Sequence, residues 1–324
     1  MKKSRSLTLA SVFSAAALAL TACQGGGGGT GGAPAADNYP EKDITFIVQA
    51  AAGGGSDLAS RALAAELEKD LGVSVIVENR PGASGSTAMQ YVADAKPDGY
   101  TIGFVPVEIS MLGHQGFDVD PANYDFLGQI MLAPGVVSVP VDSPIKTMDD
   151  LVAAGKKEPL NMANSGPGSI WEAAERGIAD ATGAQIVPVP FDGGAPAVAA
   201  VIGKQVDGAV GGTSESQAAH NAGQIRALAV LHNERHPLIK DVPTAKELGY
   251  DLEFGGWGGV YAPKDLPAEV RDRLASAIEK SAKSEGFINT ISKGGALPVY
   301  KSPEDFTSFI DSEYERFGKL LKKS

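Results

Sequence analysis

The sequence predicts an α/β fold with two domains, in which parallel or mixed sheets are flanked by helices. From Tyr39 onward, short apolar runs alternate with segments of helical periodicity, a pattern typical of parallel sheets. After Asp120 the pattern starts again with a second set of such units. The 324 residues are also enough for two domains of ordinary size.

The first domain opens with a strand, a glycine loop and a helix. The apolar run Ile44–Val48 predicts a strand that is buried on both faces. A helix follows, because apolar residues then recur every four positions, at Ala59, Leu63, Leu67 and Leu71. Gly72 stands where a left-handed C-cap is needed. The later elements predicted in this domain are strands at 73–77 and 100–105 and a helix at 86–95.

The second set of elements begins with a strand at 136–140 and a helix that Thr147 opens in capping-box style, with Asp150 in place of Glu. Further strands are predicted at 160–163, 186–189, 208–210 and 225–231, and further helices at 170–182, 196–202 and 215–222. A strand at 257–262 returns to the first domain, followed by amphipathic helices at 267–284 and 303–321. The predicted boundaries are 38–135 with 256–324 for domain 1, and 136–255 for domain 2.

The first 22 residues have the pattern of a targeting segment. A basic end with Lys2, Lys3 and Arg5 precedes an apolar core too short to span a bilayer comfortably. The run from Leu20 to Cys23 resembles the bacterial lipoprotein cleavage box, which implies a lipid on Cys23, the only cysteine. An ordinary secretory signal with an incidental cysteine is the alternative. Residues 23–37 are Gly-rich and predict a tether, so we expect an extracytoplasmic, lipid-anchored protein.

Composition restricts the classes of partner. The formal net charge is −11 and there is no basic block, which argues against nucleic acid. A single cysteine excludes an internal disulfide and a multi-cysteine metal site. We expect no cofactor and no metal, and a monomeric protein.

The loop between the first strand and the first helix predicts an anion site. The first turn of a helix has backbone N–H groups without internal partners, and the helix dipole makes that end positive. Three consecutive glycines allow a ligand to approach the backbone closely. The candidate ligand residues here are Ala52, Gly53, Gly54, Gly55, Ser56 and Asp57. A tight turn capped by Ser56, with Asp57 paired to Arg61, is the structural interpretation, and both can hold together.

Three more strands end in Gly/Ser/Thr loops that open helices. Four such loops in one chain indicate two facing rims of a polar cleft. The candidate ligand residues in the later loops are Ser165, Gly166, Gly168, Ser169, Asp192, Gly193, Thr213 and Ser214.

Several short runs resemble one protein family in their order along the chain. They are Tyr39-Pro40, Ala51–Asp57, Val77–Gly82, Lys96–Thr101, Val189–Phe191, Gly203–Asp207, Asp241–Thr244, and Trp257 with Ala262-Pro263. The chain is similar in these runs to the substrate-binding proteins of tripartite tricarboxylate transporters, the Bug receptors. The resemblance implies a periplasmic-binding-protein-like fold whose cleft closes on a small carboxylate, and delivery to a two-subunit membrane permease. It also implies that amides in Ala51–Asp57 and Asn164–Ser169 hold the carboxylate.

The departures from the family pattern concern charge. Glu108 and Asp192 stand where the family often has neutral or basic residues, and Trp171 stands where it often has His. If both acids face the cleft, they repel a trianion and favour an amino-acid-like or less charged ligand. If both point to solvent, they have no such effect. Trp171 is either a stacking lid or, as the safer interpretation, simple packing.

Two other functions were weighed. A hydrolase or nucleotide-binding enzyme is distant, because no nucleophile elbow and no Walker loop is present. His232 and His236 are interpreted as surface residues rather than zinc ligands. An extracytoplasmic sensor that presents its ligand to a receptor kinase is compatible with the same sequence. The predicted mechanism is closure of two domains about crossings near 134–136 and 254–257, followed by hand-over of the ligand.

Overall fold

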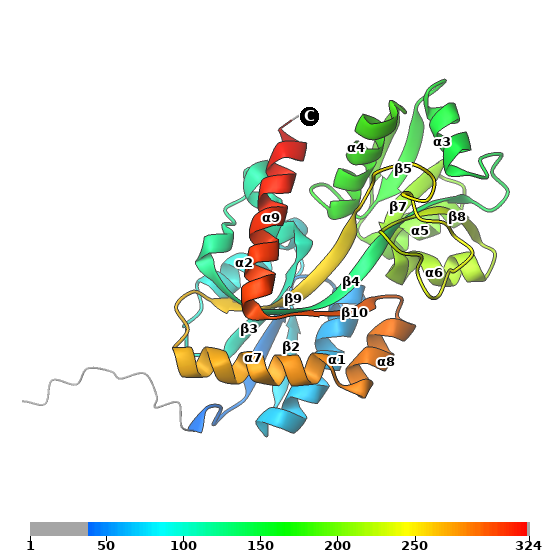
Figure 1. The fold of residues 1–324 in the computed structure, drawn as a ribbon. Helices are drawn as coiled ribbons and strands as arrows, with labels where there is room; N and C mark the ends of the chain where they lie inside the picture. Colours follow the sequence, from blue (N-terminus) through cyan, green and yellow to red (C-terminus); the bar gives the residue numbers. More distant parts are fainter. Residues whose placement is uncertain (1–37, 323–324) are drawn as a thin grey trace, which may run out of the picture. The chain divides into compact units, whose positions relative to one another are not determined.

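The computed structural model describes residues 38–322, in which helices and strands alternate as predicted (Figure 1). The strands are β1 (Ile44–Val48), β2 (Val75–Asn79), β3 (Thr101–Pro106), β4 (Tyr124–Pro140), β5 (Leu160–Asn164), β6 (Ile186–Pro190), β7 (Gly208–Gly212), β8 (Ile225–Leu231), β9 (Gly255–Pro263) and β10 (Leu297–Lys301). The α-helices are α1 (Gly55–Leu71), α2 (Ser86–Ala93), α3 (Met148–Gly155), α4 (Ile170–Thr182), α5 (Gly194–Ile202), α6 (Thr213–Asn221), α7 (Ala268–Ala282), α8 (Glu285–Lys293) and α9 (Pro303–Leu321).

The strands form a mixed sheet in the order β2-β1-β3-β9-β4-β7-β5-β6, and β10 and β8 also pair with β4. β1 lies between β2 and β3 and is parallel to both, which confirms the predicted βαβαβ unit. In the second half, β5 is parallel to β6 and β7. Parallel neighbours place the carboxyl ends of their strands, and hence the loops after them, along one edge.

β4 connects the two halves of the sheet. Tyr124 to Pro134 pair with β9, whereas from Gly135 onward the strand pairs with β7 and β8. The backbone N–H of Gly135 donates to the carbonyl of Phe254 over 2.8 Å at this change of partner. Only 136–140 was predicted as a strand, so the sequence prediction missed the longer first part of β4, whose register is broken by two irregularities. We call the part of the sheet on the β1 side the first sheet and the part on the β5 side the second sheet.

Helices cover both faces of the first sheet. α1, α7 and α8 pack on one face, over side chains such as Phe46 and Ile278. α2 and α9 pack on the other face, where Met89 and Phe306 belong to a second cluster. This second cluster continues past the first sheet to Trp171 and other residues of the second sheet. An apolar core therefore runs between the two sheets.

The core contains glycines at positions where a larger residue has no room. A methyl group on Gly258 of β9 would lie 2.1 Å from Cζ of Phe104, and one on Gly259 would lie 2.4 Å from the Phe306 ring. Such distances are well inside van der Waals contact, so the glycines let aromatic rings pack directly on the strand backbone.

Two elements near the C-terminus differ from the prediction. The predicted helix 267–284 is divided, because Ser284 accepts a hydrogen bond from the N–H of Phe287 and thereby starts α8. The strand β10 was not predicted; it contains Pro298 and pairs at the side of β4 that the main strand order leaves open. The predicted capping box of Thr147 and Asp150 is confirmed at α3.

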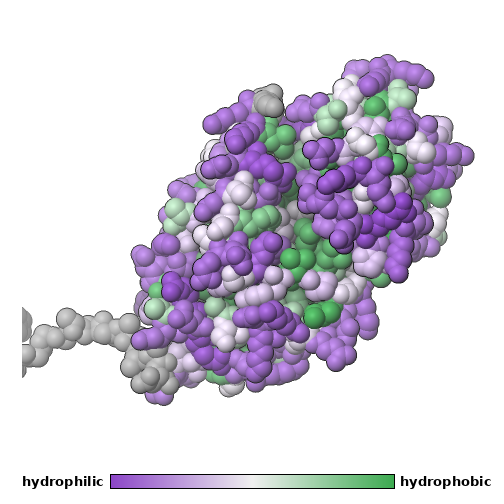
Figure 2. All heavy atoms as spheres, in the orientation of Figure 1, coloured by the Kyte–Doolittle hydropathy of each residue, from purple (hydrophilic) through white to green (hydrophobic). Residues whose placement is uncertain are grey.

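The described residues include no helix that is long and apolar enough to cross a membrane. The predicted targeting segment, tether and lipid site at Cys23 lie outside the described residues. On the face shown in Figure 2, hydrophilic residues cover most of the surface and hydrophobic residues gather near its middle, where the surface is hollowed.

Candidate ligand-binding site

The loop before α1 has the form predicted for an anion site, with one correction. α1 begins at Gly55 and its N-cap is Gly54, which makes no side-chain capping bond. Ser56 is therefore not the cap; its hydroxyl instead accepts a hydrogen bond from Nε2 of Gln49 over 3.0 Å. Gly53 has a φ of 89°, a conformation that glycine adopts at low cost. Ala52, Gly53 and Gly54 are exposed to solvent.

Asp57 anchors this loop. Its carboxylate accepts hydrogen bonds from the N–H of Gly53 (2.9 Å), Nε of Arg61 (3.1 Å) and Nδ2 of Asn79 (2.9 Å). Burial disfavours the ionised carboxyl, but these hydrogen bonds outweigh burial and lower the pKa of Asp57. The predicted pairing with Arg61 is present. All these partners belong to the chain itself, so Asp57 shapes the loop and is engaged before any ligand arrives.

The amides that remain for a ligand are those of the first helical turn. Within residues 38–322, the N–H groups of Gly55 and Ser56 have no hydrogen-bond acceptor, whereas that of Gly53 is bonded to Asp57. The N–H of Gly54 reaches only the carbonyl of Ala51 at 3.4 Å, which is a long bond. The structure thus places free donors at the positive end of α1, one to two residues later than the glycines themselves.

The second predicted loop, Asn164 to Ser169, differs because most of its amides already have acceptors. The N–H of Gly166 donates to Oδ1 of Asn164, and that of Gly168 donates to Oε2 of Glu172. The N–H of Ser169 donates to the carbonyl of Gly166, and Ser169 acts as the N-cap of α4. Ser165 is partly exposed. The prediction that this loop offers several free amides is therefore not met in this conformation.

Glu108 lies against this second loop. It belongs to a short 3-10 helix, η3 (Val107–Ser110), directly after β3, and its Oε1 accepts a hydrogen bond from the N–H of Ile170 over 3.2 Å. Burial raises the pKa of Glu108. Of the two orientations left open by the sequence, the structure shows Glu108 directed at the first turn of α4. Ser84 makes a neighbouring contact, since its hydroxyl donates to the carbonyl of Pro167 over 2.6 Å.

The loop before α5 contributes less. Asp192 is exposed, and no hydrogen bond or ion pair of its side chain is formed within residues 38–322. Its solvent-facing orientation matches the alternative weighed from the sequence. Gly193 is the N-cap of α5 with a φ of 110°, and its N–H donates to the carbonyl of Phe191 over 2.9 Å.

The loop before α6 reaches the first sheet's domain. Thr213 donates its hydroxyl proton to the carbonyl of Gly295 over 2.7 Å. A methyl group on Gly55 would lie 3.8 Å from both Cβ and Oγ of Ser214. The N-termini of α1 and α6 therefore face each other, as the prediction of two facing rims requires.

Glu215 is absent from the residues predicted from sequence, yet it lies at the centre of these loops. Its carboxylate accepts a hydrogen bond from the N–H of Gly212, and burial raises its pKa. Methyl groups on Gly55 and Gly212 would lie 3.9 Å and 2.6 Å from its carboxylate oxygens, and one on Gly194 would lie 2.8 Å from its Cγ. A glutamate three residues after an N-cap glycine is half of a capping box, which is the signal that could have identified it.

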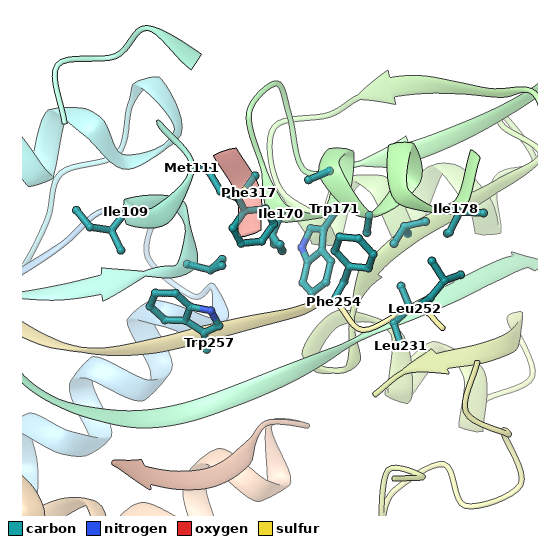
Figure 3. Close-up of a cluster of buried hydrophobic side chains, with 14 of the residues drawn as sticks. Ile109, Met111, Ile170, Trp171, Ile178, Leu231, Leu252, Phe254, Trp257 and Phe317 are labelled. Atoms are coloured by element: carbon teal, nitrogen blue, oxygen red, sulfur yellow. The ribbon is translucent and has the colours of Figure 1, made fainter. Parts of the chain in front are cut away.

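Trp171 packs in the core rather than covering a ligand from outside. The side chain is 7% exposed, and glycines at 135, 212 and 256 make room for its ring. Figure 3 shows its indole beside Phe254, with Ile109, Met111 and Trp257 on the side of the first sheet and Ile178, Leu231 and Leu252 on the other. The packing interpretation is therefore confirmed. Its indole N–H has no acceptor within residues 38–322.

One further correction concerns the histidines. His236 was interpreted as a surface residue, but it is 1% exposed, because the loop after β8 folds over it and the N–H of Leu238 donates to its Nδ1. Burial lowers its pKa. Residues 38–322 contain no cluster of His, Cys, Asp or Glu side chains suited to a metal ion.

Two surface hollows lie away from the predicted residues. One is next to β10 and the start of α9, lined by Tyr300, Lys301, Ser302, Asp305, Ser308 and Phe309. The other lies between the start of β4 and α9, and its walls include Tyr124, Lys264, Arg271 and Tyr314. Neither contains any candidate ligand residue, so the loops after the strands remain the candidate site.

The arrangement of two sheets joined by shared strands, with helix N-termini meeting between them, is the two-domain fold of periplasmic binding proteins. Residues 59–324 match the family model described as the tripartite tricarboxylate transporter family receptor, and the chain belongs to this family. The resemblance found in the sequence is thereby confirmed.

Similar proteins agree with this assignment. A protein of Agrobacterium vitis, described as a UPF0065 protein in the TAR-I ttuE-ttuC' intergenic region, is 32% identical over 90% of this chain and 87% of its own. The structure of the periplasmic binding protein BugD is 29% identical with a TM-score of 0.80, covering 88% of this chain and 98% of its own. The structure of R. palustris Rpa4515 with adipate is 28% identical with a TM-score of 0.81, covering 88% and 97%.

Proposed function

We propose that this chain is an extracytoplasmic receptor that captures a small carboxylate between its two domains and delivers it to a tripartite tricarboxylate-type permease. The observation that carries the proposal is the N-terminus of α1. The amides of Gly55 and Ser56 are free there, at the positive end of a 17-residue helix. A carboxylate is the small anion that such a site binds well.

Closure follows from the neighbours of this site. Ser214 of the second sheet's domain is within van der Waals distance of a methyl group placed on Gly55. A ligand held by α1 therefore also touches α6 when the domains are together, and it loses those contacts when they separate. Such differential contacts are what allow a ligand to stabilise a closed state. The hinge is proposed at β4 and β9, where Gly135 and Phe254 are bonded.

Family membership supports binding without chemical turnover. The family is one of transporter receptors, and the similar R. palustris structure contains adipate, a small carboxylate. Delivery to a permease is proposed on the same basis. The permease would recognise the closed form, because only that form presents surfaces of both domains in a fixed arrangement.

The lipid anchor is proposed from the sequence alone. Cys23 follows a basic and apolar segment, and a Gly-rich stretch separates it from the folded domains. Acylation at Cys23 would hold the receptor near the permease without a membrane-spanning helix.

The experiment is calorimetric titration of the mature protein with adipate and with hexanoate, using Gly54→Val as the test variant. Gly54 has a φ of −77°, and an added Cβ would meet only the carbonyl oxygen of Ala51 at 3.5 Å, so the variant can fold. Its side chain obstructs the approach to the free amides. We expect the dissociation constant of the bound probe to rise at least tenfold in Gly54→Val.

His232→Ala is the control, because His232 is placed away from the loops described above. It is expected to bind like the wild type. Undiminished binding in Gly54→Val, or no binding of either probe to the wild type, would contradict the proposed function.

A further inference from the structure

Carboxylates of the chain already occupy the N-terminus of α4. Oε1 of Glu108 accepts from the N–H of Ile170 over 3.2 Å, and Oε2 of Glu172 accepts from the N–H of Gly168 over 2.7 Å. In a cleft that opens toward two helix ends, this end is the place for a second ligand carboxylate. Here its donors are taken, and the positive end of the helix dipole is offset by two acidic side chains.

Glu215 has the corresponding position at α6. It accepts from the N–H of Gly212, and its carboxylate lies close to Gly55 and Gly194. It therefore stands next to the free amides of α1 while belonging to the other domain. A ligand carboxylate at α1 can bind there only in a way that leaves the rest of the ligand directed along a wall that contains Glu215.

No cation neutralises these two glutamates. Among residues 38–322, Glu172 pairs with Arg176 and Asp57 pairs with Arg61, whereas neither Glu108 nor Glu215 takes part in an ion pair. The walls of the site therefore differ in character. The first sheet's domain offers donors, and the second sheet's domain presents unpaired carboxyl groups.

The remaining surface between the glutamates is aromatic. A methyl group on Gly212 would lie 2.6 Å from Oε2 of Glu215 and 3.1 Å from Cζ2 of Trp171, so the carboxyl group and the indole edge are neighbours. Glu108 bonds Ile170, the residue before Trp171. An uncharged chain can lie along this indole edge, whereas a second anion would lie between the two acids.

We propose that Glu108 and Glu215 determine the charge selectivity of the site, so that it takes a small monocarboxylate and rejects di- and tricarboxylates. This inference rests on the proposed function, because it assumes that a carboxylate binds at α1. Two like charges close together in a partly desolvated cleft repel strongly, and specificity is often achieved by such repulsion. Both glutamates act on the ligand's far end, not on the carboxylate held by α1.

The test compares two ligands that differ only in that far end. Hexanoate and adipate have the same number of carbons, but adipate carries a second carboxylate. Dissociation constants of both are measured by calorimetry at pH 7.5 for the mature wild-type protein, Glu108→Gln, Glu215→Gln and the control Glu158→Gln. Glu158 is an exposed acid of the same domain as Glu215, and its side chain has no contact with the site. Thermal unfolding verifies that each variant is folded.

We expect the wild type to bind hexanoate at least tenfold more tightly than adipate. We expect each glutamine variant to reduce this ratio at least threefold, chiefly by binding adipate better, while Glu158→Gln leaves the ratio unchanged. Glu108 also caps α4, so if Glu108→Gln fails to fold, the wild-type ratio and Glu215→Gln still decide the matter.

Tighter binding of adipate than of hexanoate by the wild type would overturn the inference and leave the proposed function standing. A ratio that is the same in Glu215→Gln as in the wild type would also overturn it and would reduce Glu215 to a helix cap. If neither probe binds, the proposed function and the inference fail together.

Discussion

The N–H of Ile170 donates a hydrogen bond to Oε1 of Glu108 over 3.2 Å, which joins the residue after β3 to the first turn of α4. Each residue follows a strand of a different sheet, so the bond exists only while the two domains are together. Beside it, Ser84 donates to the carbonyl of Pro167 over 2.6 Å, and elsewhere Thr213 donates to Gly295. These bonds stabilise the arrangement of the two domains without a ligand, and they lead to testable consequences.

Removal of one bond between the domains should favour the open form. Ser84→Ala deletes only a hydroxyl group, and a hydrogen bond of this type contributes about 0.5–1.5 kcal/mol. We expect the radius of gyration of the unliganded protein, measured by small-angle X-ray scattering, to increase. The dissociation constant of the bound carboxylate should rise by a factor of about 2 to 10.

Ser312→Ala is the matched control for this variant, because Ser312 donates to the carbonyl of Phe309 within α9 and contacts neither sheet's loops. It should change neither quantity. An unchanged radius and affinity in Ser84→Ala would show that the bond to Pro167 does not hold the domains together.

A second prediction concerns Glu175, which is fully buried in α4. Nδ2 of Asn164 donates to its Oε2 over 2.7 Å, and its other oxygen has no partner within residues 38–322. Burial raises the pKa of Glu175 to about 9, and the neighbouring Glu172 raises it further. The unfolded chain releases this proton near pH 4.5, whereas the folded protein keeps it, so folding stability falls as the pH rises through the interval between these values.

Glu175→Gln keeps the shape and the bond to Asn164 but removes the titration. We expect the free energy of unfolding of the variant, relative to the wild type, to increase with pH between 5 and 8, by at most about 1.4 kcal/mol per pH unit. Urea denaturation at four pH values measures this difference. Glu158→Gln should show no such trend, and a pH-independent difference for Glu175→Gln would mean that Glu175 is ionised in the folded protein.

The third prediction tests the anchor. Cys23→Ser removes the only thiol to which a lipid could be attached, so the protein should move from the membrane fraction to the soluble fraction of the expressing bacterium. Immunoblotting of fractions measures the change, and metabolic labelling with a fatty acid should lose its signal in parallel. A soluble wild-type protein would favour an ordinary secretory signal instead.

Much of the fold could be predicted from the sequence because it is determined by local patterns. The apolar run of β1 and the four-residue repeat of α1 each specify one element, and parallel neighbours follow from their alternation. The division at Ser284 and the strand β10 could not be predicted in this way. An N-cap inside an amphipathic run and a short strand containing Pro298 are selected by packing against α1 and β4, which local periodicity does not reveal.

By itself, the sequence determined the alternation of strands and helices, the family, and the loops at which helix N-termini meet, since each depends on residues that are neighbours along the chain. Only the tertiary structure decided which of those N-termini are free. Glu108 is 62 residues from Ile170, and Glu215 is far from Gly55 in the sequence, so their contacts depend on how β4 joins the two sheets. The availability of an amide and the charge beside it are properties of contacts between distant segments, and these arise only when the chain is folded.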